Sequence, residues 1–303
     1  MPVGCNREPK RVIAVIPKDN SDIFWQSVHA GAVKAARESN VDIIWDGPTT
    51  ETDYSAQVQI VDAMMNRRVD AIALAPSDRK ALVSVVNRAA DRKVPIVIFD
   101  SGLDTDRFVA QVATDNYKAG QIAGERMGAV LNGTGKVAIV ATKPGAASTE
   151  AREKGFEDVI QRKYPGIRIL DKRFGMALVA QSLLVTENVL TAHPDLDGIF
   201  SSNESTSIGA AQALRSRPRK AKLVGFDWSP TLLDDLKSGL IDSLVIQDPF
   251  RMGYLALEAA VNHLDGKPVT KMMDLAPRLI DRGSLADAEV QAQLHPDLQK
   301  YLK

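Results

Sequence analysis

The sequence has little or none of several features that would assign it to a class of protein. A single cysteine, Cys5, among 303 residues excludes an intramolecular disulfide and an all-cysteine metal site. No apolar run approaches the roughly 20 residues that a membrane-spanning helix needs. The 38 basic residues cancel the 38 acidic ones, so net charge does not indicate a nucleic-acid or anionic-membrane partner. With 45% hydrophobic residues, the chain can bury one large core or two medium ones.

The strongest pattern in the chain is a unit that occurs twice. In residues 69–102 an apolar run, a helical pattern and a second apolar run follow one another, which predicts a strand, a helix and a strand. Residues 196–229 repeat this order. In each unit the last aspartate stands 30 positions after the first, and it is Asp100 in the first unit and Asp227 in the second. The repetition predicts two related lobes.

The remaining chain alternates in the same way. Apolar runs predict strands at 11–16, 41–45, 136–141, 167–171 and 243–247, and helical spacing predicts helices at 24–36, 55–66, 150–163, 181–192, 232–237 and from 249 onwards. This alternation with short connections predicts an α/β fold with a doubly wound parallel sheet in each lobe. Residues 271–280 are predicted to form one strand, followed by a polar terminal extension that crosses between the lobes.

The predicted strand ends carry polar and aromatic side chains. In open parallel sheets, ligands bind beyond the carboxyl ends of the strands. Those ends carry residues 18–25, Asp100, Asn203, Asp227 and Gln247. Planar carboxylate and amide groups can pair with two neighbouring hydroxyls at once, and aromatic rings cover the apolar face of a sugar. The pattern therefore favours a polyhydroxylated ligand between the lobes.

Two other functional classes find less support. Asp100, Asp227 and His29 could serve acid–base chemistry, but no nucleophile with a base partner is evident, and there is neither a Walker-type phosphate loop nor a G-x-G-x-x-G motif. Only about ten residues precede the first predicted strand, which leaves no room for the helix-turn-helix of a two-lobed repressor. We therefore expect a binding protein without catalytic activity, metal or cofactor.

Six stretches carry a resemblance to a known family. They are IFWQSVHAGAVKAA, VPIVIFDSG, TDNYKAGQIAG, EAREKGF, LTAHPDLDGIFSSNE and LVGFDWSP. Over about residues 11–277 the chain resembles the periplasmic sugar-binding proteins of the ribose/galactose type, the receptors of sugar ABC transporters. The resemblance implies a type I periplasmic binding protein fold, with two lobes that close around a monosaccharide or polyol. It also implies a monomer that presents its closed form to a membrane permease.

The resemblance further implies the division of the chain and the binding residues. The N-terminal lobe would comprise 10–114 plus 247–277, and the C-terminal lobe 115–246 plus 278–303, with crossovers near residues 114, 247 and 277. Phe24 and Trp25 resemble aromatics that sandwich a sugar, although adjacent aromatics at a helix start also occur in cores. The expected ligand-binding residues are Lys18, Asp22, Phe24, Trp25, Asp100, Ser101, Arg152, Asn203, Asp227 and Gln247.

Three positions depart from the pattern of ribose binders. Ser101 stands where they have an arginine, Ala75 where they have an asparagine and Ala177 where they have an aromatic residue. These departures favour another pentose, a hexose or a polyol over ribose itself.

A related branch of the family offers an alternative. Lys18 and Asp100 resemble the basic and acidic contacts of autoinducer-2 receptors, but the Asp-Gln pair of that branch falls on Ser148 and Thr149. An autoinducer-2-type or other small polar signal is therefore the second hypothesis. Lys18 could bind a carboxylate or phosphate of the ligand, or it could be a solvated surface lysine.

The context of Cys5 bears on localisation. Val3-Gly4-Cys5 resembles the end of a lipoprotein processing site, although Pro2 stands where leucine is usual. The alternative is an incidental thiol in a frayed terminus. No charged and apolar signal segment precedes Cys5, so either such a segment has been removed or the protein is cytosolic. The family resemblance favours a periplasmic or cell-envelope protein.

Overall fold

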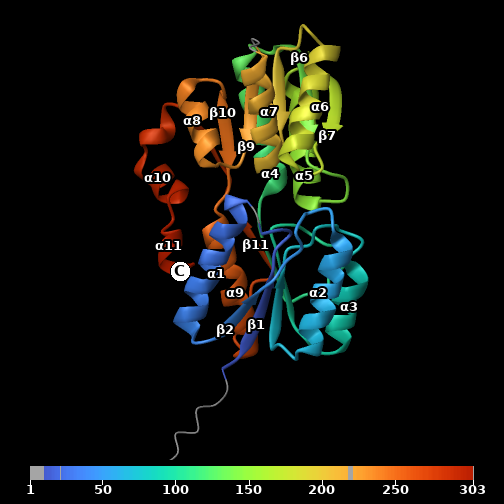
Figure 1. Ribbon diagram of the computed structural model, residues 1–303, viewed down its shortest axis with the longest axis vertical. Coiled ribbons are helices and arrows are strands. Elements are labelled where there is room, and N and C mark those ends of the chain that lie inside the picture. Colours follow the sequence, from blue (N-terminus) through green and yellow to red (C-terminus); the bar gives the residue numbers. More distant parts are fainter. Residues whose placement is uncertain (1–9, 21, 218–220, 303) are drawn as a thin grey trace, which may run out of the picture.

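Six parallel strands form the sheet of the first lobe, which is the lower one in Figure 1. The structure is a computed structural model and describes residues 10–20, 22–217 and 221–302. The strands are β1 (Val12–Ile16), β2 (Asp42–Trp45), β3 (Ala71–Leu74), β4 (Ile96–Phe99), β5 (Ala110–Thr114) and β11 (Met272–Leu275). Their order is β11-β5-β4-β3-β1-β2. Strands of this type are buried on both faces, which explains why β1, β3 and β4 are continuous apolar runs.

Helices cover both faces of the first sheet. On one face, α2 (Tyr54–Asn66) and α3 (Val83–Asp91) bury their apolar side chains against β1, β3 and β4. On the other face, α1 (Ile23–Ser39) and α9 (Pro249–Leu264) pack beside each other over the same strands. The result is a three-layer lobe with one hydrophobic core on each side of its sheet.

The second lobe repeats this topology. Its strands are β6 (Thr134–Ala141), β7 (Gly166–Phe174), β8 (Gly198–Ser201), β9 (Lys222–Phe226), β10 (Ser243–Ile246) and β12 (Arg278–Asp281). They are ordered β12-β10-β9-β8-β6-β7, and all neighbours are parallel except β10 and β12. The strand order β10-β9-β8-β6-β7 matches the order β5-β4-β3-β1-β2 of the first lobe strand for strand. The predicted pair of doubly wound lobes is therefore confirmed.

Helices also cover both faces of the second sheet. They are α4 (Asn116–Val130), α5 (Ala147–Lys163), α6 (Val179–Ala192), α7 (Glu204–Ser216) and α8 (Pro230–Ser238). The first two share one core with the sheet, and the last three bury the opposite face. Among the described residues, no helix is both long enough and apolar enough to cross a membrane.

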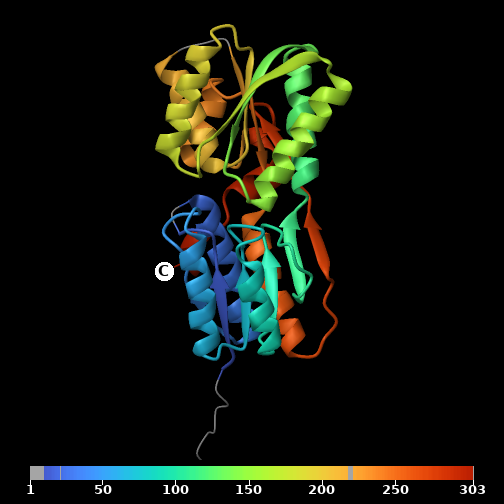
Figure 2. The same cartoon turned by 90° about the vertical axis from the view of Figure 1, so that its right-hand side faces the viewer.

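The chain passes from one sheet to the other three times. It leaves the first lobe between β5 and α4, returns between β10 and α9, and crosses again between β11 and β12 (Figure 2). The boundaries of the lobes at single-residue precision stay a prediction.

The C-terminal region corrects one expectation. Residues 271–280 form two strands, β11 and β12, which belong to different sheets. Pro277 lies between them, and a proline has no N–H with which to continue a strand ladder. The single strand predicted there was wrong.

The terminal extension is helical and contacts both lobes. It contains η1 (Ser284–Ala286), α10 (Ala288–Leu294) and α11 (Leu298–Tyr301). Val290 and Leu294 are buried in the core of the second lobe. Arg37 of α1 donates hydrogen bonds to the carbonyl oxygens of Lys300 and Tyr301, at 2.8 and 3.3 Å. The extension thus lies along one side of the molecule and bridges the lobes, as Figure 1 shows.

Candidate functional site

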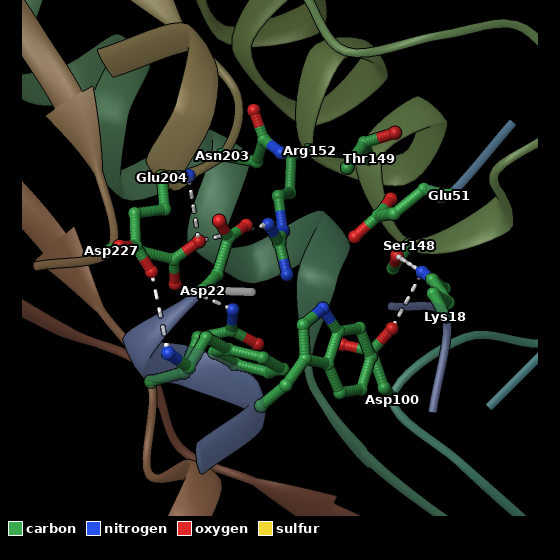
Figure 3. Close-up of a pocket in the computed structure, with 13 residues that line it drawn as sticks. Lys18, Asp22, Glu51, Asp100, Ser148, Thr149, Arg152, Asn203, Glu204 and Asp227 are labelled. Carbon is green, nitrogen blue, oxygen red and sulfur yellow. Dashed lines mark hydrogen bonds and ion pairs between the residues drawn. The ribbon is translucent and has the colours of Figure 1, made fainter. Parts of the chain in front are cut away.

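A cavity lies between the lobes, at the carboxyl ends of the strands (Figure 3). Its empty volume is about 330 Å³, including its opening to solvent. The lining residues are Lys18, Asp22, Phe24, Trp25, Glu51, Asp100, Ser148, Thr149, Arg152, Asn203, Glu204, Asp227 and Gln247. Nine of the ten residues predicted from the sequence line it. The tenth, Ser101, borders it and accepts a hydrogen bond from the backbone N–H of Ser148 at 3.1 Å.

Four lining residues were not among those predicted. Glu51 follows β2, and Glu204 follows Asn203 at the end of β8, so both obey the rule that ligands meet the carboxyl ends of strands. That rule, applied to every strand, would have identified them. Ser148 and Thr149 lie at the start of α5 and reach the cavity only because the second lobe lies against the first.

The two aspartates that end the repeated units occupy equivalent positions. Asp100 has a φ angle of 61° and Asp227 one of 63°. The backbone N–H of each donates to a carbonyl of the adjacent strand, at Val112 and Val245 respectively, and both distances are 2.9 Å. Aspartate and asparagine tolerate this left-handed conformation better than most residues. The same turn in each lobe therefore directs one carboxylate into the cavity from either side.

Asp100 forms a buried ion pair with Lys18. The Lys18 Nζ lies 2.6 Å from the Oδ2 of Asp100 and 3.2 Å from the Oγ of Ser148 in the opposite lobe. Lys18 is only 2% exposed, so its interpretation as a solvated surface lysine was wrong. Its burial results from the second lobe, which covers the end of β1. Because Asp100 already neutralises this ammonium group, its capacity to bind an anionic ligand is reduced.

Asp227 is held by a denser set of contacts. Its Oδ1 accepts a hydrogen bond from Gln247 Nε2 at 2.7 Å, and its Oδ2 accepts one from the N–H of Glu204 at 3.1 Å. The Nη1 of Arg152 lies 3.9 Å from the same Oδ2. Burial raises the pKa of Asp227, and the charge of Arg152 opposes this effect. The side chain of Gln247 also accepts a hydrogen bond from Thr114, at 2.7 Å, so it joins two crossover segments beside the cavity.

Arg152 is locked in place from several directions. Its Nε donates to Asn116 Oδ1 at 2.8 Å, its Nη1 donates to the carbonyl of Ser202 at 2.9 Å, and its guanidinium lies over the ring of Phe226. Burial lowers its pKa. Helix α4 approaches closely here, since a Cβ at Gly120 would lie 1.9 Å from the carbonyl oxygen of Arg152. The arginine is thus a preorganised cation at the floor of the cavity.

Helix α1 receives its cap from the other lobe. Its own N-cap residue, Asp22, makes no side-chain cap hydrogen bond. Instead, the N–H of Phe24 donates to Glu204 Oε2 at 3.3 Å across the cleft. Burial, together with the negative charges of Asp22 and Asp227, raises the pKa of Glu204 to about 9. Glu204 is therefore protonated at neutral pH, and its carbonyl oxygen can still accept the hydrogen bond from the N–H of Phe24.

The aromatic pair serves both the cavity and the core. Phe24 and Trp25 contact each other edge to face at 4.9 Å, and Trp25 meets Phe99 at 6.4 Å. Both belong to the core cluster of the first lobe and both line the cavity. Of the three tryptophans, only Trp25 lines it: Trp45 stacks on His29, and Trp228 lines a separate apolar hollow beside the C-terminal extension.

Two of the three departures from ribose binders lie away from this cavity. Ala75 is fully buried in the core of the first lobe, and Ala177 lies in a left-handed bend after β7. Neither lines the cavity, whereas Ser101 borders it.

The lobes also meet at a latch outside the cavity, formed by the loops after β3 and β6. Lys143 Nζ donates to the carbonyl of Ser77 at 2.6 Å, and the N–H of Arg79 donates to the carbonyl of Gly145 at 2.8 Å. None of these four residues lines the cavity. Gly145 has a φ angle of 83°, and a Cβ there would lie 2.1 Å from Asp78 Oδ2. These contacts join the two lobes directly.

The latch leads to a prediction for Lys143→Met. The variant removes a charge-assisted hydrogen bond between the lobes, so we expect the closed state to become less populated and the ligand to bind more weakly. Such a bond is worth about 1.5–3 kcal/mol, part of which offsets the burial of the ammonium, so we expect a Kd raised about tenfold. Calorimetry measures the Kd, and stopped-flow experiments measure the rate of ligand dissociation. Lys154→Met, at a side chain that is 61% exposed, is the control; equal Kd values for both variants would exclude a latch.

A comparison with models of protein families identifies the family of this chain. A family model described as a periplasmic binding protein domain matches residues 13–268. The chain belongs to the periplasmic binding protein family. The ribose import binding protein RbsB of Bacillus subtilis (strain 168) is 30% identical over 256 residues, which are 84% of this chain and 82% of that protein.

Solved structures of solute-binding proteins have the same fold as this chain. A carbohydrate transporter solute-binding protein of Agrobacterium radiobacter, in complex with D-arabinose, has a TM-score of 0.93 and 33% identity over 95% of this chain and 100% of that chain. An ABC transporter solute-binding protein of Agrobacterium vitis with bound D-fucose has a TM-score of 0.91 and 33% identity, covering 94% and 100%.

These findings confirm the family predicted from the sequence. Periplasmic binding proteins are solute receptors, and membership in this family indicates the periplasm or the cell envelope. The alternative of an autoinducer-2-type receptor finds no support, because the relatives described above are associated with sugars. Cys5 lies outside the described residues, so a lipid anchor there stays a prediction.

Proposed function

We propose that this protein is the receptor of a bacterial sugar ABC importer and binds a monosaccharide or polyol in the cavity between its lobes. The observation that carries this proposal is the pair of equivalent aspartates, Asp100 and Asp227, which face the same cavity from opposite lobes. A ligand that contacts both carboxylates links the lobes, so binding and closure become one event.

The lining suits a small polyol in size and chemistry. The empty volume of about 330 Å³, which includes the opening to solvent, favours one sugar ring over an oligosaccharide. Carboxylates and amides accept and donate to hydroxyls, while the ring of Trp25 offers an apolar face. Relatives crystallised with D-arabinose and D-fucose support a pentose or hexose.

The proposal extends to partners and localisation. The closed form would be recognised by a membrane permease, and the receptor would act as a monomer that releases its ligand chemically unchanged. Acylation of Cys5 would tether it to the cell envelope. Mass spectrometry of the protein extracted from membranes tests the acylation, and size-exclusion chromatography with light scattering tests the monomer.

A ligand screen tests the function. A ligand that binds only the folded state raises its melting temperature by mass action. Pentoses, hexoses, polyols, sugar acids and autoinducer-2 would be screened by thermal shift, and hits measured by calorimetry and recovered for chemical analysis. We expect a neutral sugar or polyol to bind and to be recovered intact. Failure of every sugar and polyol to bind would overturn the proposal.

Tryptophan fluorescence locates the ligand. Trp25 lines the cavity and is 2% exposed, whereas Trp45 and Trp228 do not line it. We expect the ligand to shift or quench the emission of the wild type, and Trp25→Phe to lose most of that signal while still binding. A signal that persists in Trp25→Phe and vanishes in Trp228→Phe would place the ligand in the hollow beside the C-terminal extension instead.

A further inference from the structure

Within the described ranges 10–20, 22–217 and 221–302, one carboxyl group of the cavity has no hydrogen-bond or ion-pair partner. Glu51 lies in the loop between β2 and α2, is 8% exposed and lines the cavity. Figure 3 shows its carboxyl group directed toward the middle of the cavity. Among the described residues, none donates a hydrogen bond to it within 3.5 Å. The carboxyl group therefore has acceptor capacity that a donor group of a ligand in the cavity can satisfy.

The other carboxylates of the lining differ from Glu51 in this respect. Asp100 is paired with Lys18 at 2.6 Å, and Asp227 accepts hydrogen bonds from Gln247 and from the backbone of Glu204. Their charge and acceptor capacity are partly satisfied before any ligand arrives. Glu51 therefore keeps its acceptor capacity for the ligand.

The cations of the cavity are already engaged. Lys18 contacts Asp100 and Ser148, and Arg152 donates to Asn116 and to the carbonyl of Ser202. Among the described residues, the lining contains two cations and five carboxyl groups, which belong to Asp22, Glu51, Asp100, Glu204 and Asp227. An anionic ligand group near Glu51 would meet like charge, while both cations of the lining already have partners in the protein.

We propose that Glu51 binds the ligand directly and selects at its position a hydrogen-bond donor, a hydroxyl or an ammonium group, against a carboxylate or phosphate. This inference rests on the proposed function, since it assumes a sugar-like ligand in the same cavity. Five charged groups act on Glu51: Lys18, Lys143 and Arg152 favour the carboxylate, and Asp19 and Asp100 oppose it. Burial dominates and raises the pKa of Glu51 to about 7, so its selectivity is best measured at pH 8, where the carboxylate prevails.

The test uses a matched set of ligands. The neutral sugar that binds best in the screen is compared by calorimetry with its aldonic and uronic acids and its amino-sugar derivative, at pH 8. For the wild type we expect both acids to bind at least tenfold more weakly than the neutral sugar, and the amino sugar to bind within tenfold of it. Glu51→Gln keeps the shape of the side chain but removes its charge, so we expect the ratio of acid to neutral-sugar Kd to fall about tenfold for at least one acid.

The ratio of affinities separates selection from structural damage, because a loss of folding or closure affects all ligands alike. Glu289→Gln, at a side chain that is 80% exposed and lies outside the cavity, should leave the ratio unchanged. An acid that binds the wild type as tightly as the neutral sugar, or an unchanged ratio in Glu51→Gln, would overturn the proposal while leaving the sugar receptor intact. A wild type that binds no sugar at all would overturn the proposed function and this inference together.

Discussion

Asp227→Asn is expected to raise the Kd for the ligand by about tenfold to 150-fold, the equivalent of the 1.5–3 kcal/mol of one charge-assisted hydrogen bond. Each oxygen of Asp227 accepts a bond, one from Gln247 Nε2 and one from the N–H of Glu204. An asparagine has only one acceptor oxygen, so one of these buried donors loses its partner. The substitution also removes the negative charge nearest to the buried Arg152.

Asparagine is the informative substitution because it preserves the backbone. At a φ angle of 63°, alanine would add strain that has no relation to the ligand, whereas asparagine adopts this conformation readily. Asp234→Asn, at a side chain on α8 that is 75% exposed, is the matched control. Calorimetry with the ligand from the screen measures the effect, and thermal unfolding checks that the variant is folded. A Kd within about threefold of the wild type would remove Asp227 from the site.

Asp100 provides an internal comparison for this result. It has the same backbone conformation in the other lobe, but its partner is Lys18, and no backbone N–H of the residues that the structure describes donates to its carboxylate. Asp100→Asn therefore leaves a buried ammonium without its countercharge and should also weaken binding. Because the two aspartates are equivalent, we expect both substitutions to raise the Kd for the ligand. Because their protein partners differ, we expect the two carboxylates to contact different groups of the ligand.

Much of the fold was predictable because the core of each lobe imposes a simple pattern. Strands such as β3 and β4 are buried on both faces and appear in the sequence as uninterrupted apolar runs. β5 and α4 were not recognised. Val112 is the main strand-forming residue in β5, and α4 contains three glycines, at 120, 124 and 128, which weaken the helical signal. Those glycines have a tertiary role that no local pattern contains: they admit α5, the helix that carries Arg152.

The site was predictable in its members but not in its pairings. The strand-end rule and the family resemblance indicated nine of the lining residues, since both depend on positions along the chain. The Lys18–Asp100 ion pair and the cap on α1 depend on how the lobes meet. Which tryptophan lines the cavity also depends on geometry: Trp25 lines it, whereas Trp228, which follows the left-handed turn at Asp227, packs in the core of the second lobe.

The cap that Glu204 provides across the cleft predicts that closure takes up a proton. In the closed arrangement, burial is the main cause that raises the pKa of Glu204 from its ordinary value of 4.5 to about 9. The negative charges of Asp22 and Asp227 add to this effect. Asp22 and Phe24 belong to the opposite lobe. Opening the cleft therefore reduces the burial of Glu204 and removes the charge of Asp22, which both raise its pKa; these losses outweigh that of the hydrogen bond from the N–H of Phe24, which lowers it, so the pKa returns toward its ordinary value. Between pH 4.5 and about 9, the closed state therefore binds more protons than the open state. Its population, and with it the ligand affinity, falls as the pH rises, by at most about tenfold per pH unit.

Other groups in the cleft titrate as well, and the pH range separates them. Burial raises the pKa of Glu51 to about 7, so its contribution has the same sign but fades above that pH. The pKa of Asp227 is also raised, whereas burial lowers the pKa of Lys143, whose contribution therefore has the opposite sign. Between pH 7 and 8.5 the group expected to change most on closure is Glu204. A variant that alters Glu204 alone leaves the other three contributions in place.

Glu204→Gln isolates the effect, because the amide keeps an oxygen for the N–H of Phe24 but cannot ionise. We expect the Kd of the wild type, relative to that of the variant, to rise about tenfold between pH 7 and pH 8.5 in calorimetric titrations with the neutral ligand. Small-angle scattering at saturating ligand should show both proteins closed at pH 7. Parallel pH profiles would mean that Glu204 keeps its protonation state when the lobes close, and then its hydrogen bond to α1 would stabilise the closed cleft without linking it to pH.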